Sequence, residues 1–393
     1  MRQKNVLVTA ARAPVAVHVS RMLHTANHRV FLCDHLKRPL GAMSKCQNGY
    51  LKIPSLRLAP DRAAQDLLKF IKIHEIEYVV PTCEEIFYLA KLWSENDIPA
   101  QLVAPPITLL ETVHNKFRFM QLTKKMGLPV PATNLLQSKA DVEPFRYASK
   151  KFVFKPVWSR FASNVLINPS REQLDRLIPT RQMPWVAQEF LLGDEVCAYA
   201  IAREGKLLAL SQYRGLIRAG LGASICFEPI TIPAVTKFVE AFVEGTKWTG
   251  QISFDLMLRG DGTVLPLECN PRTTSGVHFF DDATNFSQAL LSGQSKAAPN
   301  VNLPQGVRLA ILAYGLLGLG KQHNLRTFWY ALINGQDILK IENDPIGFIS
   351  QIKSIWEVVC IAHREKLSLQ KASTYDLEWD GPDQSNISKC RGP

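Results

Sequence analysis

A change of pattern along the chain limits the folds that it can adopt. The first hundred residues alternate short apolar strands with helical stretches, beginning with Asn5 to Thr9 and Arg29 to Cys33, which is a βαβ pattern. Six strand patterns then follow with hairpin turn signals between them, and such closely spaced strands indicate antiparallel pairing. They are Phe152 to Lys155, Trp185 to Glu189, Glu195 to Ala202, Leu207 to Tyr213, Ile252 to Leu258 and Val264 to Cys269. The 393 residues therefore predict a parallel α/β unit followed by antiparallel sheets, in more than one domain.

Composition and charge exclude several classes of protein. The formal net charge of +11 is spread along the chain, so we expect phosphate or carboxylate handling and consider nucleic acid the weaker alternative. The longest apolar run, Leu309 to Gly320, is shorter than the roughly 20 residues of a membrane span. No export signal is evident, and we expect a cytoplasmic protein with no membrane partner.

The eight cysteines form no C-x-x-C pair. Because several of them lie in apolar runs, the sequence predicts buried free thiols in a reducing compartment rather than disulfides or a zinc site. These residues are Cys33, Cys197, Cys269 and Cys360.

The last hundred residues have weaker patterns. We expect an apolar strand over Arg308 to Tyr314 and a helix from Pro345 to about His363, with Asp344 as its cap. Gly381 to Pro393 is polar, and we expect it to be loose.

The most informative segment is the acidic hairpin from Ile252 to Arg272. If Asp261-Gly262 is the turn, strand symmetry places Gly260 opposite Thr263 and Asp255 opposite Glu268. Two facing carboxylates among apolar neighbours repel each other, and a divalent cation offsets this repulsion most directly. Two carboxylates with the nearby Asn270 amide suit Mg²⁺. The alternatives are that one acid faces solvent or is protonated.

Two other polar segments each allow two interpretations. Glu84 and Glu85 follow a strand end, where open α/β sheets bind ligands, but first-turn acids also stabilise a helix. Arg214 to Ser224 holds three glycines and two arginines. Arg214 and Arg218 either clamp a substrate carboxylate or belong to a flexible basic loop.

The segments Gly250 to Asp255 and Leu267 to Arg272 resemble the metal-binding strands of the ATP-grasp superfamily. The resemblance is greatest to the branch of carbamoyl-phosphate synthetase large chains and carboxylate–amine ligases, and it runs in order from about residue 5 to about 285. Further matching motifs are Asn115-Lys116, Phe154-Lys155-Pro156, Gln188 to Leu191 and Gly193-Asp194-Glu195.

The resemblance implies a division of the chain and a role for each matched residue. The implied domains are a pre-ATP-grasp Rossmann-like domain (1–112), a small lobe (113–190), a large lobe with the metal site (191–300) and a C-terminal α/β extension (301–393). Lys116 and Lys155 would approach the nucleotide phosphates, and Glu195 would accept from the ribose hydroxyls. The adenine would lie at the hinge formed by Gln188, Glu189, Phe190 and Leu191. Asp255, Glu268 and Asn270 would hold two Mg²⁺ ions, with Mn²⁺ as the alternative metal, while Arg272 would serve catalysis. Arg218 and Arg214, as the possible clamp on a substrate carboxylate, complete the catalytic residues that we expect.

One segment departs from the family pattern. The family places a glycine-rich loop over the phosphates after Lys155-Pro156, whereas residues 157–164 of this chain hold no glycine. The loop Ser159 to Asn164 is either a bulkier lid in which Arg160 replaces backbone donors, or the mark of a degenerate, non-catalytic member.

The resemblance implies an ATP- and Mg²⁺-dependent ligase. It would activate a small-molecule carboxylate as an acyl phosphate and join it to an amine, releasing ADP and phosphate. The alternatives are a catalytically degenerate ATP-binding regulatory protein of the same fold, a thioester-forming ligase, and a kinase that stops at the acyl phosphate. The C-terminal part offers a surface for a homo-oligomer.

Overall fold

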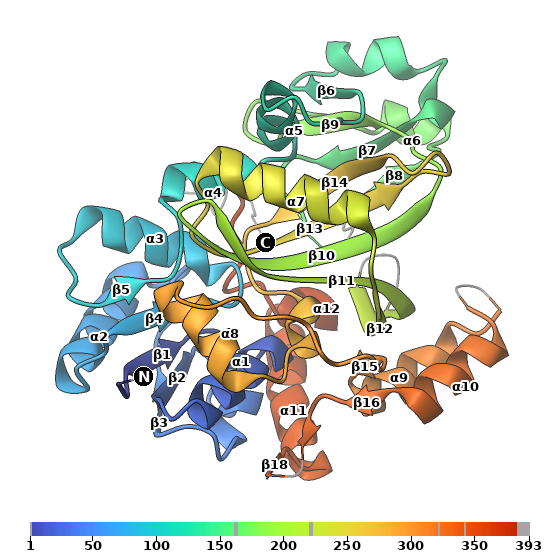
Figure 1. Ribbon diagram of the computed structural model, residues 1–393. Helices are drawn as coiled ribbons and strands as arrows, with labels where there is room; N and C mark the ends of the chain where they lie inside the picture. Colours follow the sequence, from blue (N-terminus) through green and yellow to red (C-terminus); the bar gives the residue numbers. More distant parts are fainter. Residues whose placement is uncertain (1, 161–163, 220–222, 321–322, 342, 383–393) are drawn as a thin grey trace.

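The structure is a computed structural model that describes residues 2–160, 164–219, 223–320, 323–341 and 343–382. It contains a parallel sheet, a small antiparallel sheet and a larger, mainly antiparallel sheet (Figure 1). The mixed α/β class predicted from the sequence is therefore confirmed. None of the helices within these ranges is long and apolar enough to cross a bilayer.

The N-terminal sheet has five parallel strands in the order β3-β2-β1-β4-β5. Its alternate residues face two different cores, because Leu7 packs on the side of α2 and Val6 on the side of α1. The strands are β1 (Asn5–Val8), β2 (Arg29–Asp34), β3 (Gly49–Lys52), β4 (Tyr78–Val80) and β5 (Gln101–Leu102). The helices are α1 (Pro14–Thr25), α2 (Pro60–Ile73), α3 (Glu85–Glu95) and α4 (Ile107–His114).

The small sheet has four antiparallel strands in the order β6-β9-β7-β8. Phe154 and Ala187 are fully buried in its core. The strands are β6 (Thr133–Leu136), β7 (Phe152–Pro156), β8 (Leu166–Ile167) and β9 (Trp185–Glu189), with helices α5 (Lys116–Lys125) and α6 (Arg171–Asp175).

The large sheet runs in the order β14-β13-β10-β11-β12-β15-β16. One face packs Phe254 against Phe242 of α7, while the other places Tyr199 in the same core as the N-terminal residue Val6. The strands are β10 (Asp194–Arg203), β11 (Lys206–Ala219), β12 (Ala223–Ile230), β13 (Gly250–Leu258), β14 (Val264–Asn270), β15 (Gln305–Gly306) and β16 (Gln336–Asp337). The helices beside them are α7 (Pro233–Thr246) and α8 (Ala283–Ser287).

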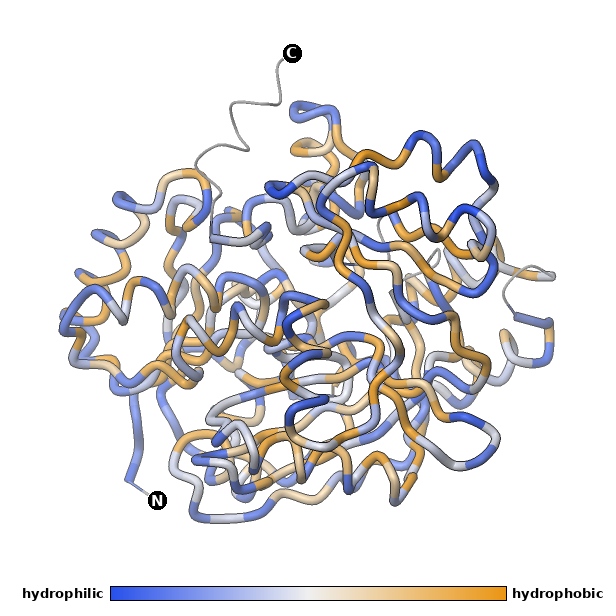
Figure 2. The backbone as a smooth tube through the Cα atoms, turned by 90° about the horizontal axis from the view of Figure 1, so that it is seen from above, coloured by the Kyte–Doolittle hydropathy of each residue, from blue (hydrophilic) through white to orange (hydrophobic). Residues whose placement is uncertain are grey.

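The C-terminal residues are mainly helical, and two sequence-based predictions are wrong here. The apolar run predicted as a strand is helix α9 (Arg308–Leu317), because a short apolar run does not distinguish a strand from a helix. The helix expected from Pro345 to about His363 is present as α11 (Phe348–Arg364), but the expected cap at Asp344 is wrong, since Asp344–Pro345 form strand β18 against β17 (Lys340–Ile341) and Gly347 precedes the helix. The remaining helices are α10 (Leu325–Asn334) and α12 (Leu369–Ala372). In Figure 2 hydrophilic and hydrophobic residues alternate along the outer helices, as amphipathic helices require.

Of the thiols predicted to be buried, Cys33 and Cys269 are buried, but Cys197 is half-buried and Cys360 is exposed on α11. The predicted burial of Cys360 is therefore wrong. Most of the loose C-terminus expected from the sequence lies outside the described residues.

Candidate functional site

The acidic pair lies where the sequence places it. Asp255 on β13 is the register partner of Glu268 on β14. The predicted turn pairing of Gly260 with Thr263 is wrong, since Arg259 donates its N–H to the Thr263 carbonyl at 2.9 Å. An irregularity in the ladder between Asp255 and Leu256 shifts the register by one residue and restores the pairing of the two acids.

Two buried lysines converge on β14 from different elements. Lys116 begins α5, whose cap is the Asn115 side chain, and its Nζ lies 3.1 Å from Glu268 Oε2. The same Nζ donates to the Ser159 carbonyl at 2.7 Å. Lys155, near the end of β7, donates to the Leu267 carbonyl at 3.0 Å. The hairpin and both lysines, distant in sequence, therefore form one cluster.

The pKa values of the two acids are shifted in opposite directions. Burial opposes ionisation of Glu268, but the charges of Lys116 and Lys155 outweigh it and hold the pKa of Glu268 below its usual range. Burial and the neighbouring Glu268 charge raise the pKa of Asp255. Burial also lowers the pKa of Lys155 to about 8, against the attraction of Glu268. A cation beside Asp255 would offset this strained arrangement of charge.

Asn270 and Arg272 extend the cluster beyond the acids. Asn270 Nδ2 donates to Asp255 Oδ2 at 3.2 Å, and Arg272 Nη2 donates to Asn270 Oδ1 at 3.0 Å. The Cys197 thiol donates to Asp255 Oδ1 at 3.2 Å, a contact that the sequence analysis missed. Burial raises the pKa of Cys197 far above its usual value, so the thiol stays protonated and acts as a donor.

The donors around Asp255 fit a hard divalent cation. Across the described ranges no group of three or more His, Cys, Asp and Glu side chains could hold a metal ion. The side chains that could offer oxygen ligands here are two carboxylates and one amide, Asp255, Glu268 and Asn270. This set suits Mg²⁺, which usually keeps several waters and binds through one or two carboxylates together with substrate phosphates.

The predicted hinge joins the small sheet to the large one. Gln188 and Glu189 end β9, where Gln188 Nε2 donates to Thr133 Oγ1 at 3.2 Å. The Phe190 N–H donates to the Lys151 carbonyl at 2.8 Å, and the Leu191 side chain is buried.

Just past the hinge, Gly193 has a φ of +158°. A Cβ there would collide with the Leu258 carbonyl oxygen, so only glycine allows this close approach.

One of the two candidate arginines reaches the cluster. Arg218 Nη2 lies 2.9 Å from Glu195 Oε2, and Glu195 acts electrostatically on both Asp255 and Lys155. Arg214 instead pairs with Glu228 across β11 and β12, at 2.5 Å. The expected flexible loop is wrong for its described residues, because Arg214 and Arg218 both belong to strand β11. Residues 220–222 of that segment lie outside the described residues.

The loop after β7 is tied to the C-terminus. Arg160 is buried, and its guanidinium lies 3.0 Å from Glu84, 2.9 Å from Glu378 and 2.9 Å from Asp380. The hypothesis that Arg160 offers its charge to a nucleotide is wrong for this structure, since these acids engage it. Residues 161–163 of the predicted lid lie outside the described residues.

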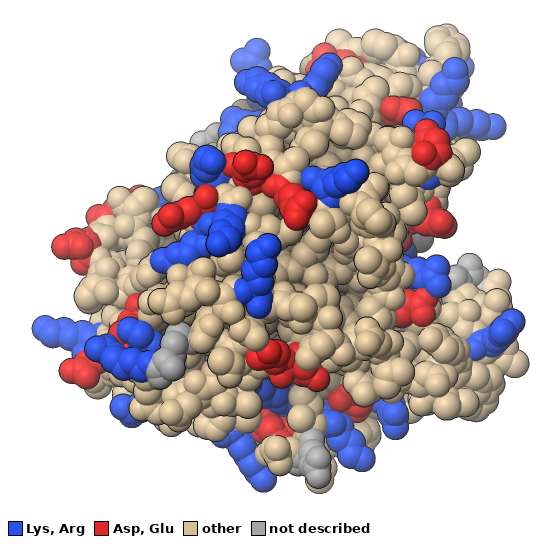
Figure 3. All heavy atoms as spheres, viewed as in Figure 1, with Lys and Arg blue, Asp and Glu red and all other residues tan. Residues whose placement is uncertain are grey.

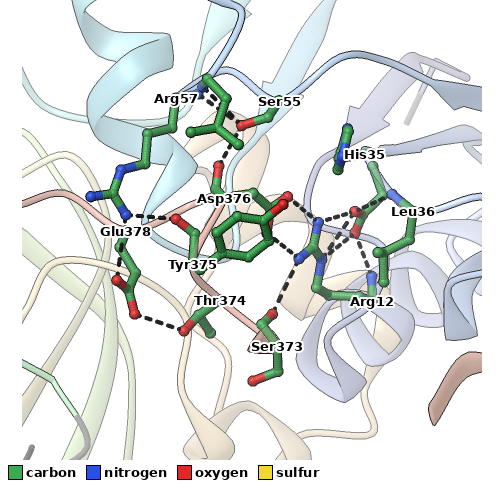
Figure 4. A network of polar contacts seen from close by, with 12 residues as sticks. Arg12, His35, Leu36, Ser55, Arg57, Ser373, Thr374, Tyr375, Asp376 and Glu378 are labelled. Atoms are coloured by element: carbon green, nitrogen blue, oxygen red, sulfur yellow. Dashed lines mark hydrogen bonds and ion pairs between the residues drawn. The ribbon is translucent and has the colours of Figure 1, made fainter. Parts of the chain in front are cut away.

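The C-terminal segment Ser373–Asp380, here called the strap, passes between the N-terminal domain and this loop. Figure 4 shows its acids facing arginines of the N-terminal domain. Arg12 donates two hydrogen bonds to the Asp376 carboxylate, at 2.6 and 2.7 Å, and Arg57 Nη2 donates one to Asp380 Oδ2 at 2.6 Å. The sequence analysis missed the strap, because no local pattern links residues more than 300 positions apart.

The strap also decides between the two interpretations of Glu84 and Glu85. Glu84 accepts from the Trp379 N–H at 2.9 Å in addition to its pair with Arg160. Glu85 accepts from the Thr9 hydroxyl and from the N–H groups of Thr82 and Cys83 at the start of α3. Both acids therefore have structural partners, which favours the interpretation that they stabilise the fold.

Comparisons with known proteins agree with this geometry. Residues 113–276 match the family model of the ATP-grasp domain. The hairpin, the two lysines and the hinge all lie within or beside that range. Residues 113–276 therefore carry an ATP-grasp domain, and the resemblance to this superfamily inferred from the motifs is confirmed over that range.

Solved structures of several enzymes share the fold. An L-amino acid ligase from Bacillus licheniformis superposes with a TM-score of 0.57 at 16% identity, covering 74% of this chain and 75% of that one. The biotin carboxylase domain of a Hydrogenobacter thermophilus 2-oxoglutarate carboxylase, solved with MgADP, ADP and bicarbonate, gives 0.58 at 13% identity, covering 75% and 71%. An uncharacterized protein of Methanocaldococcus jannaschii is 19% identical over 67% of each chain.

Proposed function

We propose that this protein is an ATP- and Mg²⁺-dependent ligase that joins a small-molecule carboxylate to an amine. A carboxylate oxygen of the substrate attacks the γ-phosphorus of ATP, the bond to the bridging oxygen breaks, and ADP leaves. The amine nitrogen then attacks the acyl phosphate carbon and loses a proton, and inorganic phosphate leaves. The ATP-grasp domain supports the first step, and the similarity in fold to an amino acid ligase supports the second.

The chain's own charges are suited to hold the phosphates. Lys116 and Lys155 supply positive charge beside β14, and Arg272 extends it toward the end of that strand. Phosphoryl transfer depends mainly on positioning and electrostatic stabilisation, so buried and preorganised cations are effective here. Asp255, Glu268 and Asn270 would hold Mg²⁺, in one or two ions or with Mn²⁺ in its place, and the metal would neutralise charge on the phosphate oxygens.

The hinge and Glu195 are suited to the nucleoside. Phe190 and Leu191 offer apolar contact for an adenine at the junction of the two sheets. Glu195 is 38% exposed in its side chain and is oriented by Arg218, so its second oxygen can accept from a ribose hydroxyl. Arg218 therefore acts as a positioning residue for Glu195 in this proposal. Arg214, which is paired with Glu228, is left as a contact for the second substrate.

The observation that carries the proposal is the facing of Asp255 and Glu268 beside two buried lysines. The test is to incubate the full chain with ATP, Mg²⁺ and pairwise pools of the twenty amino acids. Mass spectrometry then measures the condensed product, and a coupled assay measures ADP. We expect a product whose formation needs ATP and both substrates. ADP release without any product would argue for water as the acceptor in place of an amine.

A second candidate is a regulatory protein that binds ATP without turning it over. The observation that favours it is the loop after Lys155, which lacks glycine and whose Arg160 is held by three acids. Such a protein would bind ATP with Mg²⁺ in a calorimeter and release no ADP with any substrate pool.

A further inference from the structure

Helices α9 and α10 form a hairpin that projects from the edge of the large sheet (Figure 1). They pack against each other and against β11. Few residues of the two helices are buried: Ile311 and Gly315 on α9, and Phe328 and Ala331 on α10. The rest of the hairpin surface faces outward.

That outer surface is strongly apolar. The exposed side chains include Leu317 at 77%, Ile333 at 71% and Trp329 at 49%. Five more exposed apolar or aromatic side chains join them on the same two helices: Leu312, Tyr314, Leu316, Leu325 and Tyr330. Single exposed apolar residues need no explanation, but a concentration on two adjacent helices indicates an interaction surface.

The hairpin itself carries charge of one sign. Residues 283–336 contain no Asp or Glu, although 35 acids in 393 residues correspond to about five in a stretch of that length. The charged residues of the two helices are Arg308 on α9 and the exposed Arg326 on α10. Figure 3 shows the projecting hairpin as a mostly uncharged surface. The surface is therefore apolar with a basic border.

We propose that the α9–α10 hairpin docks onto the surface of an anionic lipid bilayer. Apolar side chains would enter the headgroup region, while Trp329, Tyr330 and Tyr314 have the amphipathic rings that favour the membrane–water interface. The basic residues would attract anionic headgroups. Each helix has ten residues, or about 15 Å, so the hairpin lies on the membrane and does not span it.

The charge pattern favours lipid over a second copy of the chain. A symmetric dimer through this face would bring two acid-free, basic surfaces together, and like charges would oppose each other. An anionic membrane complements the same surface. The proposal amends the sequence-based expectation of no membrane partner, which considered only spanning segments, and it is independent of the ligase activity.

The test is flotation of the full chain with vesicles. Wild-type protein is mixed with vesicles of phosphatidylglycerol and phosphatidylcholine in equal parts, or of phosphatidylcholine alone. We expect binding to the anionic vesicles that weakens as salt is raised. The variant Leu317→Glu/Ile333→Glu places two charges on the exposed face, and we expect the lipid concentration for half-binding to rise at least tenfold (about 1.4 kcal/mol).

The matched control places the same charges on other exposed apolar positions. Ile73 on α2 is 62% exposed and Ile178 is 65% exposed, so Ile73→Glu/Ile178→Glu adds two charges away from the hairpin. We expect this control to bind vesicles like wild type. The proposal is overturned if wild type does not float, if both double variants lose binding equally, or if binding ignores the headgroup charge. A dimer that only Leu317→Glu/Ile333→Glu dissociates, with no vesicle binding, would assign the face to a second copy instead.

Discussion

The ion network around Arg160 gives the most quantitative prediction. Arg160→Met keeps the aliphatic length and removes the charge that three acids share. Arg57 still compensates Glu378 and Asp380, whereas Glu84, with a side chain only 6% exposed, keeps just the Trp379 N–H among its named partners. Breaking a buried ion pair from one side costs about 3–5 kcal/mol. We therefore expect a loss near the lower end, about 3 kcal/mol.

The assay is urea unfolding followed by circular dichroism, with Lys91→Met as the control. The Lys91 pair with Glu95 is exposed on both sides, so its loss should change stability by well under about 1 kcal/mol. A second readout is ATP affinity, because the loop that carries Arg160 also places the Ser159 carbonyl on Lys116. If Arg160→Met destabilises no more than Lys91→Met, the strap does not hold this loop in solution.

Three other perturbations test separate parts of the molecule. Gly276→Ala would bring a Cβ to 2.5 Å from the Tyr199 Cβ in the core, and thermal unfolding should show a loss of about 1–3 kcal/mol. Lys155→Met should lower ATP affinity at least about tenfold in calorimetry without lowering the urea midpoint, because burial already penalises the lysine charge and lowers its pKa to about 8. Burial, with the nearby Arg21 charge, lowers the pKa of His18 from 6.5 to about 4. Between these two pH values His18 binds a proton in the unfolded chain but not in the folded one, so the free energy of unfolding falls as the pH drops from 6.5 toward 4. This should remove about 2 kcal/mol between pH 7 and pH 5 in urea unfolding, and His18→Gln should abolish that share.

The acidic hairpin could be predicted because a strand imposes a period of two. Asp255 and Glu268 fall on one face as soon as the turn is located, and an error of one residue at the turn was absorbed by the irregularity beside Leu256. The lysines were placed by the family motif, since nothing in the local pattern of Lys116 or Lys155 fixes where its side chain ends.

The C-terminal part could not be predicted in the same way. The apolar run from Arg308 fits a strand or a helix equally well, and tertiary packing on β11 decides for α9. Strand β12 was not predicted, because it begins at the end of the glycine-containing segment Arg214 to Ser224, for which a flexible loop was one of the two interpretations. The strap depends on long-range ion pairs such as that of Arg12 with Asp376, which leave no periodic signal in the sequence.

The measurement that tests the central claim most directly is calorimetric titration of ATP with and without Mg²⁺. Wild type should bind ATP tightly only with Mg²⁺, and Glu268→Gln should lose that Mg²⁺ dependence while remaining folded at the temperature of the titration. Asp261→Asn removes an exposed acid from the turn of the same hairpin and should bind like wild type. Unchanged Mg²⁺-dependent binding in Glu268→Gln would contradict the assignment of the facing acids as the metal site.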